Sequence, residues 1–121
     1  MALDFFEGLN VLDLGQGISG PFCAKLFADL GARVVKVEPP AGEPSRRAGP
    51  FPNDQPSLET SGIFLALNTN KLGVTLNLES VTGRELLLGL VEGADLLIEN
   101  HPPSYLAGIG LGFSDLQARN R

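Results

Sequence analysis

Short apolar runs alternate along the chain with segments whose apolar residues recur at helical spacing. The run Asn10–Leu14 ends at a glycine, and the run Arg33–Glu38 is rich in valine. Between them, Gly20–Leu30 carries apolar residues three and four positions apart, and Gly31 follows as a natural helix end. Strand–helix–strand order with short joints predicts parallel pairing and a doubly wound α/β sheet.

The second half of the chain continues this alternation after a proline-rich segment. Pro39–Ser61 has few paired apolar positions and is expected to be a long loop, a kind of segment that is functional or disordered in most proteins. The other expected elements are a short helix or extended piece at Ile63–Leu67, a half-buried strand at Val74–Leu78, a helix capped by Ser80 or Thr82 and running to Glu92, a strand at Ala94–Glu99, and a final short helix capped by Ser114.

Composition limits the classes of function. The 121 residues suit one domain, taken as 1–121, with 43% hydrophobic and 19% charged residues. A net charge of −5 predicts no nucleic-acid partner and no anionic membrane surface. No apolar run approaches the ~18 residues of a membrane span. A single cysteine and the lack of a basic, signal-like start favour a cytoplasmic protein.

The segment G-Q-G-I-S-G, Gly15 to Gly20, matches the letters of a dinucleotide-binding fingerprint, and Glu38 lies about 20 positions further on. A helix that began at Gly17 would, however, hold Pro21 in its interior, where proline removes a hydrogen bond and clashes with an earlier carbonyl. A helix capped by Ser19 would place Pro21 in the first turn, where it is tolerated. An NAD-binding domain is therefore only the third alternative.

Three separated blocks resemble the beginning of the class III CoA-transferases, the family of formyl-CoA transferase, carnitine CoA-transferase and α-methylacyl-CoA racemase. They are SGPFC followed by ADLGARVVKVEPP, the N-x-N-K segment that ends at Lys71, and DLLIEN, which ends at Asn100. The resemblance implies a Rossmann-like parallel sheet with flanking helices, as part of a larger domain in an intertwined homodimer. It also implies CoA transfer between an acyl-CoA and a carboxylic acid, without a metal.

The resemblance places the family's nucleophilic aspartate beyond Arg121, so no catalytic residue is expected within this chain. Coenzyme A or an acyl-CoA is expected to contact Gln16, Gly17, Ile18, Lys71, Leu76, Asn100 and His101. Small residues in the first loop would let the backbone approach the ligand closely. Lys71 is alternatively a solvated loop charge, and His101 alternatively a turn residue.

Three positions depart from the family pattern. Where members carry basic residues for the CoA phosphates, this chain has Pro39, Glu79 and Gly108. The expected function is therefore part of a CoA-transferring enzyme that supplies CoA-binding surface without the nucleophile. The alternative is a non-catalytic, degenerate copy that serves as an interaction domain.

Overall fold

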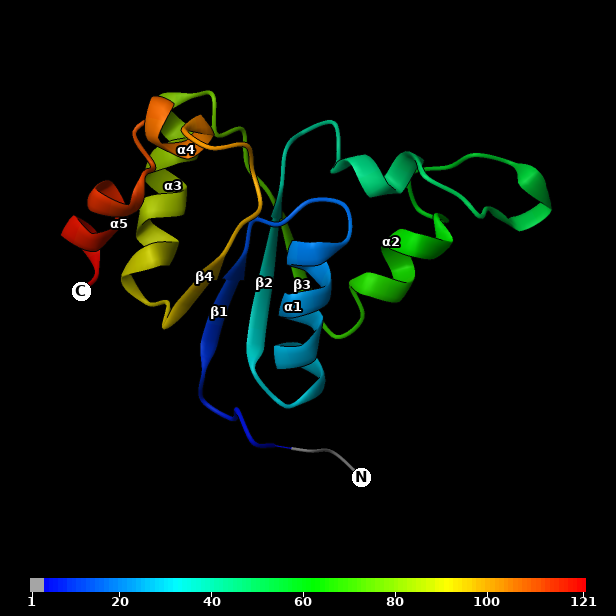
Figure 1. The fold of residues 1–121 in the computed structure, drawn as a ribbon, viewed down its shortest axis with the longest axis horizontal. Helices are drawn as coiled ribbons and strands as arrows, with labels where there is room; N and C mark the ends of the chain where they lie inside the picture. Colours follow the sequence, from blue (N-terminus) through cyan, green and yellow to red (C-terminus); the bar gives the residue numbers. More distant parts are fainter. Residues whose placement is uncertain (1–3) are drawn as a thin grey trace.

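A computed structural model describes residues 4–121, and residues 1–3 of the expected domain lie outside the described part. The elements follow one another in the alternating order expected (Figure 1). They are β1 (Asn10–Asp13), α1 (Ser19–Asp29), β2 (Arg33–Glu38), the 3₁₀ turns η1 (Pro44–Arg47) and η2 (Pro52–Asp54), α2 (Gly62–Leu67), β3 (Leu72–Thr75), α3 (Val81–Glu92), β4 (Leu96–Ile98), α4 (Tyr105–Gly108) and α5 (Phe113–Arg119).

The four strands form one parallel sheet in the order β3-β2-β1-β4, which confirms the expected fold class. The chain adds β2 and β3 on one side of β1 and then returns to place β4 on the other side. The order therefore reverses between β1 and β4. In open parallel sheets, ligands bind in the crevice beyond the carboxyl ends of the strands at such a reversal.

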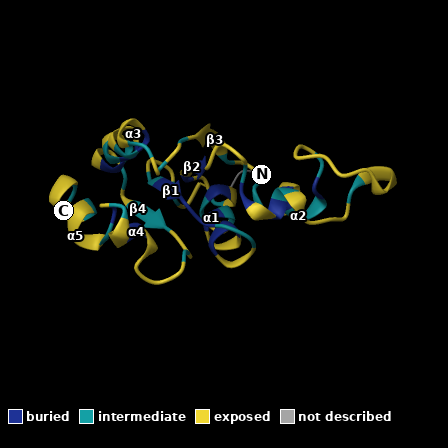
Figure 2. Cartoon of the chain, turned by 90° about the horizontal axis from the view of Figure 1, so that it is seen from above, coloured by how far each residue is buried: buried dark blue, intermediate teal, exposed yellow. Residues whose placement is uncertain are grey.

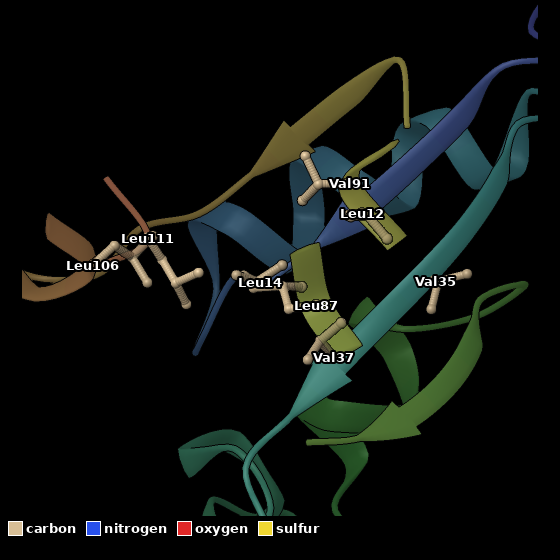
Figure 3. Packing of buried hydrophobic residues seen from close by; sticks show 8 residues of the cluster. All are labelled: Leu12, Leu14, Val35, Val37, Leu87, Val91, Leu106 and Leu111. Atoms are coloured by element: carbon tan, nitrogen blue, oxygen red, sulfur yellow. The ribbon is translucent and has the colours of Figure 1, made fainter. Parts of the chain in front are cut away.

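Helices cover both faces of the sheet. On one face, α1 packs Ala24 and Ala28 against Val11 and Val34. The other face carries the larger apolar cluster, drawn in Figure 3, in which α3 packs on the middle strands and the segment around α4 extends the cluster past their carboxyl ends. Its buried members are Leu12, Leu14, Val35, Val37, Leu87, Val91, Leu106 and Leu111. The chain between η1 and α2 instead extends away from the sheet and is mostly exposed (Figure 2).

The strand expected at Val74–Leu78 is shifted and is not half-buried. The strand β3 is Leu72–Thr75, and all four of its residues are exposed at the sheet edge. Thr75 pairs with Glu38, which is the last residue of β2. Pairing stops there because Pro39 follows Glu38 and ends β2. Leu76 and Leu78 continue the alternation without a partner strand and pack, partly buried, on the larger apolar cluster.

The helices begin close to the residues expected from the sequence, but two of their cap residues differ. As expected, α1 begins at Ser19 with Pro21 in its first turn, but Ile18 occupies the cap position and makes no side-chain cap. Ser80 caps α3, and its hydroxyl accepts a hydrogen bond from the Gly83 amide at 2.9 Å. The final helix is capped at Gly112 rather than at Ser114.

Within residues 4–121, none of the helices has the length and apolar character that crossing a membrane requires.

Candidate functional site

A cavity of about 350 Å³ opens at the carboxyl ends of the strands. Its walls come from the loop after β1, the end of β2 with the two prolines that follow, the segment between β3 and α3, and the turn between β4 and α4. Apolar side chains and backbone make up most of these walls, and Gln16, Asn77 and His101 add hydrogen-bonding groups. The cavity thus lies where the order of the sheet favours a ligand.

Asn100 holds the loop after β1 against the end of β4. Its side-chain oxygen accepts from the Gln16 amide at 2.7 Å, and its Nδ2 donates to the Gln16 carbonyl at 2.7 Å. The same Nδ2 lies 2.9 Å from the hydroxyl of Ser19, at the start of α1. One side chain therefore fixes both backbone groups of Gln16 and the helix that follows.

Buried charged side chains also hold the loop after β1 in place. Asp13 is fully buried, and its carboxylate accepts from the Gly15 amide at 2.8 Å and from Lys71 Nζ at 2.7 Å. Lys36 Nζ lies 3.6 Å from the Asp13 carboxylate and 3.4 Å from the Glu43 carboxylate, and it donates to the Gly15 carbonyl. Glu43 in turn accepts from the Gly17 amide at 3.1 Å. These four side chains, the buried charge cluster, set the position of the Gly15–Gly17 backbone.

Lys71 belongs to this cluster and does not face the cavity. Its ammonium donates to the Asp13 carboxylate, the Pro21 carbonyl and the Asn68 side chain, each within 2.8 Å. Three acceptors occupy its three donors, and only 2% of the side chain is exposed. Lys71 is therefore not the solvated loop charge considered above, and this geometry gives it a structural role instead of a phosphate contact.

Glu38 is also engaged within the chain. Its two carboxylate oxygens accept from Arg46 Nε and Nη2 at 2.7 Å each, and one of them accepts from the Glu43 amide. The Arg46 guanidinium lies over the Phe64 ring, 3.8 Å from its centroid. Burial raises the pKa of Glu38, but the hydrogen bonds and charge of Arg46 outweigh burial and hold that pKa below its ordinary value. The carboxylate is therefore not free to bind ribose hydroxyls as a dinucleotide site would require.

The three glycines of the fingerprint have reasons of their own. A Cβ on Gly15 would lie 2.8 Å from the Gly20 backbone, and a Cβ on Gly20 would lie 2.8 Å from Gly15 Cα. Gly17 has φ of +72°, a conformation that favours glycine. The first and third glycines thus let the loop touch the helix start, and the second makes the turn. Together with the helix start at Ser19, this counts against the dinucleotide interpretation.

The structure brings part of the expected site together. Gln16, Leu76 and His101 line the cavity, and Pro39 and Glu79, two of the positions that depart from the family pattern, line it as well. The remaining expected residues do not line the cavity: Gly17 and Asn100 are hydrogen-bonded within the chain, Ile18 is 61% exposed, and Lys71 is buried. The third departing position, Gly108, lies in α4 and does not line the cavity.

The residues that support the loop could not be recognised from the sequence. Lys36 lies in a valine-rich strand and Glu43 in a proline-rich loop, so neither resembles a site residue in the sequence alone. The one available signal is Lys36 itself, since a lysine in the middle of an apolar strand requires a buried partner. Tyr105, whose ring stacks on His101 with centroids 5.0 Å apart, was also missed.

Comparison with known proteins places the chain in a family. The profile of CoA-transferase family III matches residues 6–121. The chain is 44% identical, over 95% of its length, to the succinyl-CoA:(R)-benzylsuccinate CoA-transferase subunit BbsE of Thauera aromatica, and 40% identical, over 94%, to the succinyl-CoA:mesaconate CoA-transferase of Haloarcula marismortui. It spans 28% and 29% of the lengths of these two relatives.

A solved structure gives the same result. A crystal structure of a mutant of Rv3272 from Mycobacterium tuberculosis superposes with a TM-score of 0.86 at 33% sequence identity. The superposition covers 99% of this chain and 31% of the Rv3272 chain. The match of the family profile over almost the whole sequence, together with the shared parallel sheet, shows that this chain belongs to CoA-transferase family III.

Proposed function

We propose that this chain supplies part of the CoA-binding wall of an enzyme that transfers CoA between an acyl-CoA and a carboxylic acid. The observation that carries the proposal is the cavity at the carboxyl ends of β1 and β2, beside the reversal of strand order, in a member of this family. We place the enzyme in the cytoplasm as a homodimer, and we assign the rest of its active site to segments beyond this chain.

The walls of the cavity suit the pantetheine arm of CoA better than its phosphates. Pantetheine has apolar carbons and two amide groups, and the cavity offers apolar walls with Gln16, Asn77 and His101 as hydrogen-bonding groups. We propose Gln16, Leu76 and His101 as ligand contacts, Asn100 as the residue that positions Gln16, and Gly17 as the turn that lets the loop follow this course. None of the lining residues, all of them in the described part of the chain, is a lysine or an arginine. The phosphates would then lie at the rim, near Glu79.

The carboxylates around the cavity support the proposal that the nucleophile lies outside this chain. Covalent CoA transfer needs a carboxylate that is free to attack the thioester carbonyl. Asp13, Glu38 and Glu43 are each buried and ion-paired or hydrogen-bonded. Glu79 is exposed at the cavity rim, on the side that we assign to the phosphates. We therefore propose that this chain binds CoA without catalysing transfer by itself.

The interaction-domain alternative has one observation in its favour. Leu72 and Val74 are 53% and 37% exposed on β3, an edge strand whose outer side has no partner among the described residues. Such an edge can pair with another polypeptide. Binding of CoA by the isolated chain separates the two proposals, since only the first requires a ligand in the cavity.

Glu79→Lys is expected to tighten CoA binding by about 1–2 kcal/mol, because it removes a repulsion and adds an attraction at a partly exposed site. The gain should shrink with added salt, since solvent ions screen an open site. Dephospho-CoA, which lacks the 3′-phosphate, should bind the unchanged protein at least as well as CoA. Isothermal titration calorimetry measures all four combinations of protein and ligand.

The matched control is Glu7→Lys, which makes the same charge change at an exposed position before β1, at the opposite edge of the sheet. It should leave CoA affinity unchanged. An equal gain in CoA affinity in both variants would mean that net charge alone causes it. Tight binding of CoA to the unchanged protein, with no gain from Glu79→Lys, would remove Glu79 from the phosphate end. Absence of binding to every variant would favour the interaction domain.

A further inference from the structure

The side chain of His101 contacts Glu99 on one side and Gln16 on the other, where β4 and β1 end beside the cavity. Glu99 accepts a hydrogen bond from the backbone amide of His101 at 2.8 Å, and the same carboxylate oxygen lies 3.2 Å from His101 Nδ1. On the other side of the ring, His101 Nε2 lies 3.3 Å from Nε2 of Gln16. The ring stacks on Tyr105 at an interplanar angle of 22°, and only 8% of its side chain is exposed. The position of the imidazole is thus fixed on three sides.

The two ring nitrogens of His101 face partners of opposite hydrogen-bonding character. A carboxylate can only accept, so Glu99 places a hydrogen on Nδ1. The amide nitrogen of Gln16 can only donate, so it requires a lone pair on Nε2. The ring in this arrangement faces an acceptor at Nδ1 and a donor at Nε2. If it gains a proton, Nε2 becomes a donor, and it then requires an oxygen in place of the Gln16 amide nitrogen.

The other charged residues around the cavity determine what a protonated His101 could bind. Glu38, Glu43 and Glu79 line the same cavity as His101, and the first two are ion-paired with Arg46 and Lys36. Tyr105 and Glu99 are the titratable groups beside the ring itself. Since the lining contains neither lysine nor arginine, His101 is the one lining residue whose side chain can carry a positive charge.

We infer that His101 is a proton-linked oxyanion contact of this cavity, and that Glu99 positions it and stabilises its charged form. A negatively charged oxygen of the ligand displaces the Gln16 amide nitrogen and accepts from the protonated Nε2, so that binding takes up a proton from solvent. The inference rests on the proposed function, because the oxyanion is either a free carboxylate on the acyl group or a phosphate of CoA. Both sources share one chemistry, and the probes below distinguish them.

The test uses acetyl-CoA and succinyl-CoA, which differ by a free carboxylate. Calorimetry at several pH values, in two buffers of different ionisation enthalpy, gives the affinity and the number of protons taken up. We expect up to one proton per ligand. We also expect affinity that rises as the pH falls from about 7.5 to about 5.5, by at most about tenfold per pH unit, the limit for one linked proton. Over this range an acyl carboxylate stays ionised.

Two variants separate the ring's charge from its shape. His101→Phe keeps an aromatic ring against Tyr105 but cannot be protonated, so the proton uptake that remains in it is that of the CoA phosphates. Glu99→Gln keeps the size of the side chain and its accepting oxygen but removes the charge. It should reduce proton uptake while leaving the midpoint of urea unfolding unchanged, because Glu99 is 37% exposed. A merely structural role of Glu99 would shift the unfolding midpoint and leave proton uptake as it was.

Each outcome decides the inference. Extra proton uptake with succinyl-CoA, lost in His101→Phe, supports it and identifies the acyl carboxylate as the oxyanion. Equal uptake with both thioesters, again lost in His101→Phe, supports it and identifies a phosphate. Binding of both thioesters with the same uptake in the unchanged protein and in His101→Phe overturns the inference but leaves the proposed function standing. Binding of neither overturns both.

Discussion

Asp13→Ala is expected to lower the free energy of unfolding by about 3–5 kcal/mol, the largest loss of any substitution considered for this protein. Asp13 is fully buried, and it lies 2.7 Å from the ammonium of Lys71 and 3.6 Å from that of Lys36. Its removal leaves two buried cations facing one remaining carboxylate, that of Glu43, and leaves the Gly15 amide without its acceptor. Urea denaturation followed by circular dichroism measures the loss.

The pH dependence of this variant provides a second readout. Burial lowers the pKa of Lys71, and the hydrogen bond and charge of Asp13 oppose that effect. Without Asp13 the pKa of Lys71 should fall further in the folded state, while in the unfolded chain it stays near 10.5. The unfolded chain then binds more protons, so the variant should regain stability as the pH rises toward that value. Asp4→Ala, at an exposed position, is the control, and equal small losses in both variants would contradict a buried charge cluster.

Gly83→Ala is expected to be the second most damaging change, with a loss of about 1–3 kcal/mol or more. A Cβ at Gly83 would lie 1.8 Å from the carbonyl oxygen of Asn77 and 2.6 Å from its carbonyl carbon. Both atoms are backbone, so α3 or the segment before it must move. That segment, Asn77–Glu79, lines the cavity, and the substitution should therefore also weaken CoA binding.

Gly89→Ala is the matched control, because it lies in the same helix and a Cβ there would have no atom within 4 Å. Alanine is the better helix former, so this change should stabilise the protein by up to about 1 kcal/mol. If α3 lies as close to Asn77 as the structure shows, the unfolding temperature should fall in Gly83→Ala and rise in Gly89→Ala. Thermal unfolding of the two variants in parallel measures both changes. Similar midpoints for both would mean that α3 does not approach Asn77 closely.

The parts of the fold that follow from local pattern could be predicted from the sequence. The valine-rich run Arg33–Glu38 is buried on both faces of the sheet and became β2 without any shift. Pro21 was enough to place the start of α1 at Ser19, because proline is tolerated only in the first turn. Both features depend on residues within a few positions of one another.

The parts that depend on contacts distant in the sequence could not be predicted. The alternation through Val74 and Leu78 predicted a half-buried strand, but pairing ended where β2 ended, and no signal within Val74–Leu78 itself marks that position. Lys71 was expected to be solvated or phosphate-binding, yet it reaches Asp13, 58 positions away. Three residues of the expected site, Gln16, Leu76 and His101, lie together only because the sheet brings three separate strand ends to one edge.

The most direct test of the central claim, that this chain forms a CoA-binding wall at the carboxyl edge of its sheet, is an NMR titration of the ¹⁵N-labelled protein with CoA. Amide resonances of Gln16, Gly17, Asn77 and His101 are expected to shift together in one saturable transition, while those at the amino ends of the strands stay in place. A separate groove of about 440 Å³ beside β4 and α5, lined by Phe113 and Leu116, serves as the internal comparison. Shifts confined to that groove, or no shifts at millimolar CoA, would contradict the claim.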